Sequence, residues 1–415
     1  DGLAGLDGTP LQDYGPHRGF PLSSGFSLYN QQQGASGLLD PDDPRSDEVQ
    51  LAEAIDARMG DPERRPDVFS FTFNPSEFTE EDDRTVVRQL TFIADYFRDK
   101  YPETKLFATN HGTAGPPTPH YGVRYYDLPQ FAPENLGVKV HTLMFYDLER
   151  PAPVYGNADF HFLYDFMERE HTKREIEYFP EAAWWLTFDI AVPLYLPITI
   201  EARSRDLGLI AHMLEGKLTG HRVFGTGHEW GYWQNEYCSY RMAADLAYDW
   251  HACLADLTSP MGPAAAEVQA VLEAQVALQV PLFTRAELLA YLVGTDPETE
   301  AAAAVGVVFH PLPPAPADIA RWDLARISAW RQEILAPLRT SLDAHYALVG
   351  RLEDAAAQVP ERGRPWFAEV ADGVEANTLR LAHQIAAYDA LVSRREARLT
   401  GDAALQARAE ALLDA

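Results

Sequence analysis

The stretch EEDDRTVVRQLTFIADYFRDKYPETKLFATNH, residues 80–111, contains both of the patterns that decide the fold. Its first part, Glu80 to Tyr101, has a helical pattern, and its last part, Lys105 to His111, is a short β-branched and aromatic run typical of a strand. The two patterns alternate through the middle of the chain, which predicts βα units and a parallel sheet. The other strand-like runs are VFSFTF (Val68–Phe73), VKVHTLMFYD (Val138–Asp147), REIEYFP (Arg174–Pro180) and HRVFGTG (His221–Gly227).

These patterns divide the chain into three predicted parts. Residues 1–65 are rich in Gly, Pro, Asp and Ser, which indicates loops and one helix, Asp47 to Gly60. Residues 66–260 are expected to form a (β/α) barrel-like domain, and residues 261–415, with Ala- and Leu-rich helical periodicity, an α-helical C-terminal domain. The expected fold class is therefore α/β. The five clear strands are fewer than the eight of a complete TIM barrel, so we expect a barrel that is incomplete, irregular, or completed by further strands in the N-terminal segment.

The composition excludes several classes of partner. The chain has 415 residues, with 62 acidic and 34 basic side chains and a formal net charge of −28. Such a charge repels phosphate backbones and anionic lipids, so we expect no nucleic-acid partner. The longest apolar stretch, Ile190 to Ile200, is too short to span a bilayer, so no membrane span is expected. The sequence leaves the oligomeric state open.

The two cysteines, Cys238 and Cys253, lie in a segment that has the pattern of a single helix. At about 1.5 Å of rise per residue they would be about 22 Å apart. This separation is beyond disulfide reach, so we expect two buried and unlinked thiols.

Polar and aromatic side chains follow the predicted strands at their carboxyl ends. Parallel strands end at one edge of a sheet, and ligands bind there because the loops vary while the sheet stays rigid. The candidate substrate-binding residues of this edge are Asn110, His111, Tyr146, Asp147, Trp184, Trp185, His228, Trp230, Tyr232, Trp233 and Asn235.

Two glutamates lie in the same surroundings. Glu181 directly follows REIEYFP, and Glu229 lies in GTGHEWGYWQNEY (residues 225–237), which is the densest cluster of aromatic residues and glycines in the chain. Aromatic rings with polar tips can stack on the apolar faces of sugars. Hydrolysis of a glycosidic bond needs two carboxyl groups, one protonated and one ionised. Glu181 and Glu229 are therefore the candidate catalytic pair, and the alternative for each is a carboxylate paired with an arginine.

The motifs of other enzyme classes are missing from the sequence. It has no GxGxxG that opens a helix after a strand, no GxxxxGK[ST] and no GxSxG. The residues His111, His120, His141 and Asp147 could approach one another, but their spacing matches no common zinc signature. We therefore expect neither a metal nor another cofactor.

The segments EIEYFPEAAWW (175–185), GTGHEWGYWQ (225–234) and WFAEVADGVEANTLRLAHQIAAYDAL (366–391) resemble secreted bacterial glycoside hydrolases of the (β/α)-barrel type with a C-terminal helical domain. The resemblance implies that Glu181 is the acid/base and Glu229 the nucleophile. It also implies a secreted, periplasmic or cell-surface location.

The leading functional hypothesis is a glycoside hydrolase that acts on a polysaccharide or glycoconjugate through paired carboxylates. The first alternative is a non-catalytic carbohydrate-binding protein of the same fold, and the second is a structural or scaffolding surface protein. The distance between the two carboxyl groups distinguishes the first two hypotheses, because hydrolysis requires a separation of roughly 5 to 9.5 Å.

Overall fold

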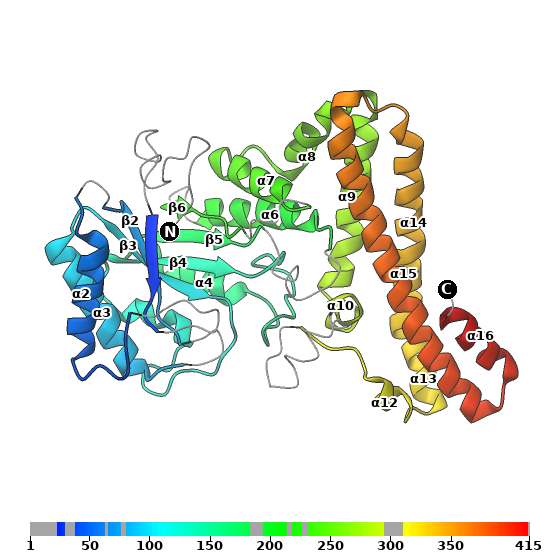
Figure 1. Ribbon diagram of the computed structural model, residues 1–415, viewed down its shortest axis with the longest axis horizontal. Coiled ribbons are helices and arrows are strands. Elements are labelled where there is room, and N and C mark those ends of the chain that lie inside the picture. Colours follow the sequence, from blue (N-terminus) through cyan, green and yellow to red (C-terminus); the bar gives the residue numbers. More distant parts are fainter. Residues whose placement is uncertain are drawn as a thin grey trace. The chain divides into compact units, whose positions relative to one another are not determined.

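The computed structural model contains one parallel sheet and many helices (Figure 1). It describes residues 23–29, 38–62, 65–75, 80–182, 194–213, 218–225, 231–293 and 310–413. The chain forms two compact units. The first consists of Asp1–Thr142, His161–Pro180 and Ile210–Arg222, and the second of Leu143–Phe160, Glu181–Leu209 and Val223–Ala415. The three-part division expected from the sequence stays a prediction.

The first unit contains the sheet. Its strands are all parallel and lie in sequence order, β1-β2-β3-β4-β5-β6. They are β1 (Ser23–Ser27), β2 (Val68–Thr72), β3 (Lys105–His111), β4 (Leu136–Thr142), β5 (Ile176–Pro180) and β6 (Gly220–His221). The predicted α/β class is confirmed, since each of the five strand-like runs contributes a strand.

Helices of the first unit cover one face of the sheet. They are α2 (Asp47–Met59), α3 (Asp83–Lys100), the 3-10 helix η1 (Tyr125–Phe131) and α4 (His161–Glu170). In α3 the buried residues Val86, Leu90, Ile93 and Phe97 recur every three or four positions, so they form one apolar face. This face packs in one core with side chains such as Phe69 of β2, which lies 5.2 Å from Phe97 between ring centroids.

The two faces of the sheet differ in chemistry. Paired residues of neighbouring parallel strands point to the same side, so the strand register sorts the side chains. One side, the apolar face, carries Phe69, Phe71, Ala108, Val138, Val140, Ile176 and Tyr178, all buried. The other side, the polar face, carries Ser23, Ser27, Ser70, Thr72, Thr109, His111, Lys139, His141, Glu177 and Phe179. On the polar face, an ideal Cβ atom at Gly137 would lie 2.6 Å from the Phe107 ring, so this strand position has room only for glycine.

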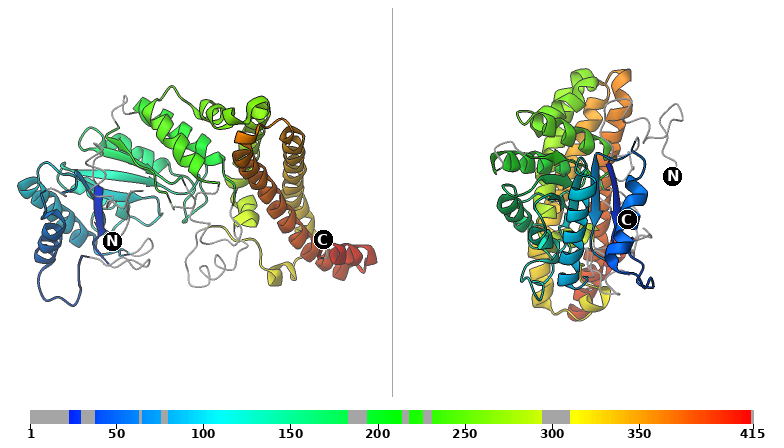
Figure 2. Two further views of the ribbon diagram at one scale, coloured as in Figure 1. Left: turned by 45° about the horizontal axis from the view of Figure 1, so that its top comes forward. Right: turned by 90° about the vertical axis from the view of Figure 1, so that its left-hand side faces the viewer.

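The described part of the second unit contains many helices and, from Trp233 onward, no strand. The helices are α6 (Ile198–Met213, of which 198–209 belong to this unit), α7 (Trp233–Ala244), α8 (Trp250–Thr258), η2 (Ser259–Ala264), α9 (Ala265–Phe283), α10 (Ala286–Val293), α12 (Pro316–Ile319), α13 (Leu324–Trp330), the π-helix η3 (Arg331–Leu335), α14 (Ala336–Ala356), η4 (Glu361–Gly363), α15 (Arg364–Thr400) and α16 (Ala403–Leu413). The long helices α14 and α15 lie side by side in both views of Figure 2.

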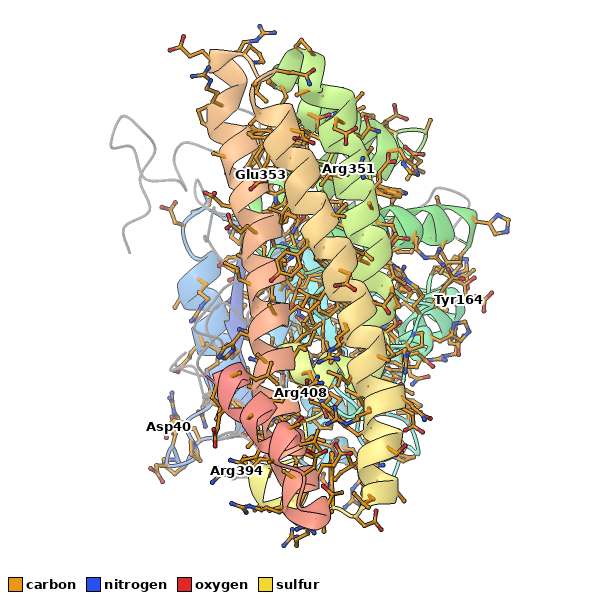
Figure 3. All side chains as sticks on the ribbon, turned by 90° about the vertical axis from the view of Figure 1, so that its right-hand side faces the viewer. Asp40, Tyr164, Arg351, Glu353, Arg394 and Arg408 are labelled. Atoms are coloured by element: carbon orange, nitrogen blue, oxygen red, sulfur yellow. A yellow bond between two sulfur atoms is a disulfide. The ribbon has the colours of Figure 1, made fainter. Side chains whose placement is uncertain are left out.

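A buried carboxylate links the last helices. Asp389 of α15 is completely buried and accepts hydrogen bonds from Arg331 (3.0 Å), Arg339 (2.5 Å) and Arg408 (2.6 Å). Arg408 comes from α16, which crosses the end of α15 (Figure 3). Three guanidinium groups therefore share this carboxylate, and Arg331 pairs with Glu396 as well.

Two expectations from the sequence were wrong. The N-terminal segment contains a strand, β1, which its sequence SSGFS did not indicate because serine and glycine are poor strand formers. Cys238 and Cys253 form a disulfide, with Cα atoms 5.7 Å apart. The single helix expected there ends at Ala244, the backbone of Asp245 is extended, and α8 begins after Asp249, whose side chain accepts from the Ala252 N–H. This break returns the chain and brings the two thiols together.

Among the described residues, no single helix is long and apolar enough to cross a bilayer. The segments Trp250–Phe283 and Ala286–Val293 meet that criterion only together, and they are bent by 108° relative to each other.

Candidate active site

Two histidines lie at the carboxyl ends of β3 and β4 on the polar face. His111 and His141 are register partners, and their ring centroids are 5.1 Å apart. His141 Nδ1 lies 2.8 Å from the Phe179 carbonyl oxygen, which can only accept, so Nδ1 carries the proton and donates it. Nε2 is then the ring nitrogen that can act as an acceptor.

His111 is fixed as a neutral ring. Its Nδ1 lies 2.6 Å from the Thr113 hydroxyl. Burial lowers the pKa of His111 well below its usual value, and the neighbouring His141 and Arg124 lower it further. A neutral imidazole at a strand end can exchange hydrogen bonds with sugar hydroxyls, as predicted for this residue, but it carries no charge.

Asn110 points to the other side of β3. Its amide donates to Asp127 of η1 at 2.9 Å, and Arg124 lies 3.4 Å from the same carboxylate. Burial raises the pKa of Asp127, although Arg124 opposes this effect. Arg124 also donates to the His111 carbonyl oxygen at 3.0 Å, so this cluster holds the end of β3 in place. The predicted substrate contact of Asn110 stays a prediction.

The predicted catalytic residue Glu181 directly follows β5 and belongs to the second unit. It is buried, and its Oε2 accepts the backbone N–H of Met144 at 2.5 Å. Met144 has a φ of 56°, in the left-handed region that residues other than glycine rarely adopt. Residue 181 also pairs with Phe224, and the Ala182 N–H donates to the Phe224 carbonyl at 3.1 Å. The Met144 N–H therefore holds the Glu181 carboxylate, and the pairing with Phe224 holds the backbone at residue 181.

The start of α7 contains a further carboxylate that sequence reasoning did not select. Burial raises the pKa of Glu236. Its Oε1 lies only 2.1 Å from where a Cβ atom of Gly225 would be, so a glycine at 225 makes room for this carboxylate. Asn235 beside it donates to the Ala182 carbonyl at 2.9 Å, which ties α7 to the residue after Glu181. The raised pKa depends on packing, which the sequence motif alone does not reveal.

At the start of α7, the ring of Tyr232 is buried and the ring of Trp233 is accessible. Tyr232 is buried, and its hydroxyl donates to the Leu194 carbonyl at 3.0 Å. Trp233 is 37% exposed, its indole N–H donates to Glu369 at 3.0 Å, and its ring packs against Trp366 at 4.9 Å between centroids. Trp233 is thus the ring here that a ligand can reach.

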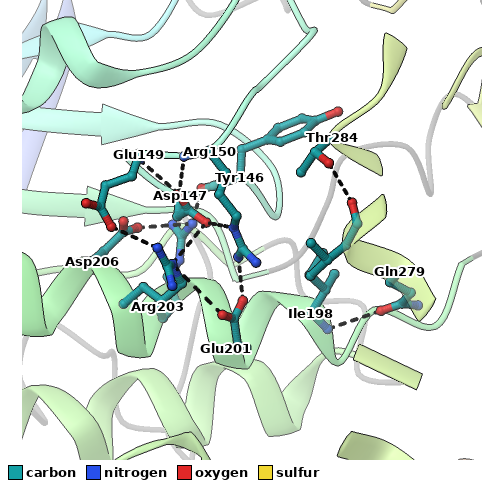
Figure 4. A network of polar contacts seen from close by, with 12 residues as sticks. Tyr146, Asp147, Glu149, Arg150, Ile198, Glu201, Arg203, Asp206, Gln279 and Thr284 are labelled. Carbon is teal, nitrogen blue, oxygen red and sulfur yellow. Dashed lines mark hydrogen bonds and ion pairs between the residues drawn. The ribbon is translucent and has the colours of Figure 1, made fainter. Parts of the chain in front are cut away.

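Tyr146 and Asp147 belong to a network of polar contacts (Figure 4). The Asp147 carboxylate accepts backbone N–H groups of Glu149 (2.9 Å) and Arg150 (2.7 Å) and pairs with the Arg150 guanidinium, which also pairs with Glu201. Burial would raise the pKa of Asp147, but Arg150 and the two N–H groups hold it below the usual range. The Tyr146 hydroxyl is buried, and Tyr146 and Asp147 border a cavity of about 10 Å³, about the size of one water molecule. A substrate role for both residues stays a prediction.

The remaining predicted residues lie outside the described part of the chain. They are Trp184, Trp185, His228, Glu229 and Trp230. Because Glu229 is among them, the distance between the Glu181 and Glu229 carboxyl groups stays outside the described structure.

Three ligand atoms that could hold a metal ion come together at Asp82, Asp83 and His120. Asp82 accepts from the Thr85 N–H at 2.9 Å and caps α3. Asp83 accepts from the His120 N–H at 2.7 Å and lies 2.8 Å from His120 Nδ1. These hydrogen bonds account for the cluster as the N-terminal anchor of α3.

A solved glycoside hydrolase has a similar fold. A GH138 enzyme targeting pectin rhamnogalacturonan II matches with a TM-score of 0.56 and 8% sequence identity, over 96% of this chain and 61% of that one. A mutant of the Thermobaculum terrenum O-GlcNAc hydrolase matches with a TM-score of 0.40 and 12% identity, over 96% and 80% of the two chains. The sequence matches no family model and no curated protein.

The chain thus spans 61% of the length of the GH138 enzyme. The expected resemblance to glycoside hydrolases is confirmed at the level of the fold.

Proposed function

We propose that this protein is a glycoside hydrolase that acts on a polysaccharide or glycoconjugate through paired carboxylates. The observation that carries the proposal is the Glu181 carboxylate, held by the Met144 N–H at 2.5 Å directly after a strand of the parallel sheet. A carboxylate fixed beside a strand end can serve as one of the two carboxyl groups that glycosidic cleavage requires. The similarity of the fold to the GH138 enzyme supports the same reading.

Glu181 is the proposed acid/base and Glu229 the proposed nucleophile. Glu236 is a second candidate for the proton donor, because burial raises its pKa and a general acid must hold its proton near neutral pH. The proposed sugar contacts are the predicted edge residues, among which His111 and Trp233 have rings that are partly accessible.

The sheet is proposed to be part of an irregular (β/α) barrel. The sequential order of six parallel strands supports this. A secreted, periplasmic or cell-surface location is proposed as well. The disulfide between Cys238 and Cys253 supports it, since disulfides persist in oxidising compartments.

A non-catalytic carbohydrate-binding protein is the second candidate. It is favoured by the engagement of Asn110 and Asp147 in hydrogen bonds to the protein itself, which leaves fewer polar groups for chemistry.

An activity screen against polysaccharides and aryl glycosides tests the two candidates. We expect turnover of at least one glycan, reduced by about two or more orders of magnitude in both Glu181→Gln and Glu229→Gln. Glu175→Gln is the matched control, because Glu175 is exposed and pairs with Lys105 before β5. Binding of a glycan without turnover would favour the second candidate, and full activity of both variants would remove the proposed pair from the mechanism.

A further inference from the structure

Two cations and one carboxylate lie close together on the polar face, on β4, β5 and directly after β6. Arg222 Nε donates to Glu177 Oε2 at 2.5 Å, and its Nη2 donates to Oε1 at 3.4 Å. Lys139, the register neighbour of Glu177 on β4, donates from Nζ to the Ser70 hydroxyl at 3.3 Å and lies 4.5 Å from the centre of the Phe179 ring. The Glu177 carboxylate is thus paired with Arg222. The Lys139 ammonium group contacts the Ser70 hydroxyl and the Phe179 ring.

This cluster has one positive charge more than it has negative charges. The pKa of Lys139 is lowered to about 8, first by burial and then by the nearby Arg222, and Glu177 only partly compensates. Among the residues that the structure describes, no carboxylate makes an ion pair with the Lys139 ammonium group, whereas a partly buried cation normally has an anionic partner. A bound anion would supply that partner, and the net charge of the cluster would become zero.

The cationic side chains of this cluster are partly accessible. Lys139, Phe179 and Gly220 are only partly buried, and the Arg222 side chain is 24% exposed, whereas Val138 and Ile176 on the apolar face are fully buried. His141 lies two residues after Lys139 on the same side of β4, which is about 6.6 Å along the strand. A group bound at Lys139 would therefore lie farther from the carboxyl end of β4 than a group bound at His141.

We propose that Lys139 and Arg222 bind the carboxylate of an acidic sugar residue on the polar face of the sheet, with Phe179 against the apolar side of the sugar. This inference rests on the proposed function, and it names the substrate class as glycans that contain uronic acids. The single surplus charge matches a monoanionic carboxylate, whereas a phosphate monoester carries about two charges. Ammonium and guanidinium donors form charge-assisted hydrogen bonds to such a group.

The test measures binding and does not require turnover. Isothermal titration compares galacturonate with galactose and glucuronate with glucose, and inorganic phosphate and sulfate are separate arms. We expect each uronate to bind at least about tenfold more tightly than its neutral counterpart, because two charge-assisted hydrogen bonds are gained. In protein labelled with ¹³C at lysine Cε, the pKa of Lys139 should rise when the uronate binds.

Two variants change the charge of the cluster in opposite directions. Lys139→Met should abolish the preference for uronates, and Glu177→Gln should keep or increase it because a competing carboxylate is removed. Lys105→Met is the control, since Lys105 pairs with the exposed Glu175 elsewhere on the sheet. A variant that merely damaged the fold could not strengthen binding, so Glu177→Gln separates the two explanations even if Lys139→Met melts early.

Equal affinity for uronates and neutral sugars would overturn the proposal, and so would an unchanged preference in folded Lys139→Met. Tighter binding of phosphate than of uronates would replace the acidic sugar with a phosphate ligand. Hydrolysis of neutral glycans without a preference for uronates would contradict this inference alone. Uronate binding without any hydrolysis would support the subsite and contradict the proposed catalytic function.

Discussion

Arg222 donates from Nη1 to the hydroxyl of Ser23 at 2.7 Å, although the two residues are 199 positions apart in sequence. Ser23 is the first residue of β1, and Arg222 directly follows β6, so the contact joins residues of the first and last strands of the six-stranded sheet. A flat sheet would keep these strands far apart, because neighbouring strands are about 4.8 Å from each other. The contact therefore requires a strongly curved sheet with the polar face inside.

The first prediction concerns this contact. In Arg222→Met the buried Glu177 loses both hydrogen bonds from the guanidinium, and the contact with Ser23 is lost as well. We expect a loss of about 1–3 kcal/mol in the free energy of unfolding, because a buried carboxylate is left without its partner. Arg98→Met is the matched control, since the exposed Arg98 pairs with the exposed Asp95 and should cost less than about 1 kcal/mol. Equal urea midpoints for the two variants would contradict the prediction.

The second prediction concerns the disulfide. Reduction should destabilise the second unit by about 3 kcal/mol, the value that loop-closure entropy gives for a loop of about 15 residues. Thermal melting with and without dithiothreitol measures the effect, and the double variant Cys238→Ala, Cys253→Ala should show no further shift with reductant. Titration of the unreduced, denatured protein should detect no free thiol, since both cysteines are paired. Two free thiols would refute the bond.

The third prediction concerns the buried Asp389. Asp389→Asn leaves Arg331, Arg339 and Arg408 without their shared counter-charge. Because a buried ion pair is broken from one side, we expect a loss of about 3–5 kcal/mol and fraying of α16, which Arg408 holds. Asp318→Asn removes the carboxylate of an exposed pair with Arg321 and serves as the control. Hydrogen exchange of α16 that is unchanged in Asp389→Asn would show that the arginines do not depend on this carboxylate.

The fourth prediction concerns acid stability. Burial lowers the pKa of His310 from 6.5 to about 3. The folded state therefore keeps the ring neutral while the unfolded state binds a proton, so stability is complete above about pH 6.5 and falls as the pH decreases toward 3. His310→Gln should reduce the slope of the unfolding free energy against pH in this window. His161→Gln, at an exposed position, should leave the slope unchanged, and equal slopes for both variants would disprove the assignment.

The sequence predicts the strands rich in β-branched and aromatic residues better than it predicts β1 or the break between α7 and α8. Lys105–His111 and Ile176–Pro180 are recognisable because β-branched and aromatic residues are concentrated there, whereas Ser23–Ser27 has no such signal and forms a strand through its pairing with β2. The break at Asp245 interrupts a segment of strong helical character, so the disulfide was missed.

The candidate site is less predictable than the fold, because strand register decides which side chains meet. Nothing in the sequence aligns Lys139 with Glu177, or shows that Asn110 faces Asp127 while His111 faces His141. Register follows from the three-dimensional pairing of the strands.

The fifth prediction concerns Glu236 and distinguishes it from Glu181 as the proton donor. Burial raises the pKa of Glu236, and a general acid is active only while it is protonated. If Glu236 donates the proton, kcat/KM of the wild type should fall as the pH rises through this raised pKa, and Glu236→Gln should lose that limb of the profile. The variant should be slowed by about two or more orders of magnitude on natural glycans. It should regain most of its activity on nitrophenyl glycosides, whose leaving group needs no proton. Glu181→Gln, measured on the same substrates, shows which of the two carboxyl groups is the acid. If Glu181→Gln recovers activity with nitrophenyl glycosides and Glu236→Gln does not, Glu181 is the acid, as the sequence predicted. Glu236 is then a carboxylate with a packing role, for which Gly225 makes room.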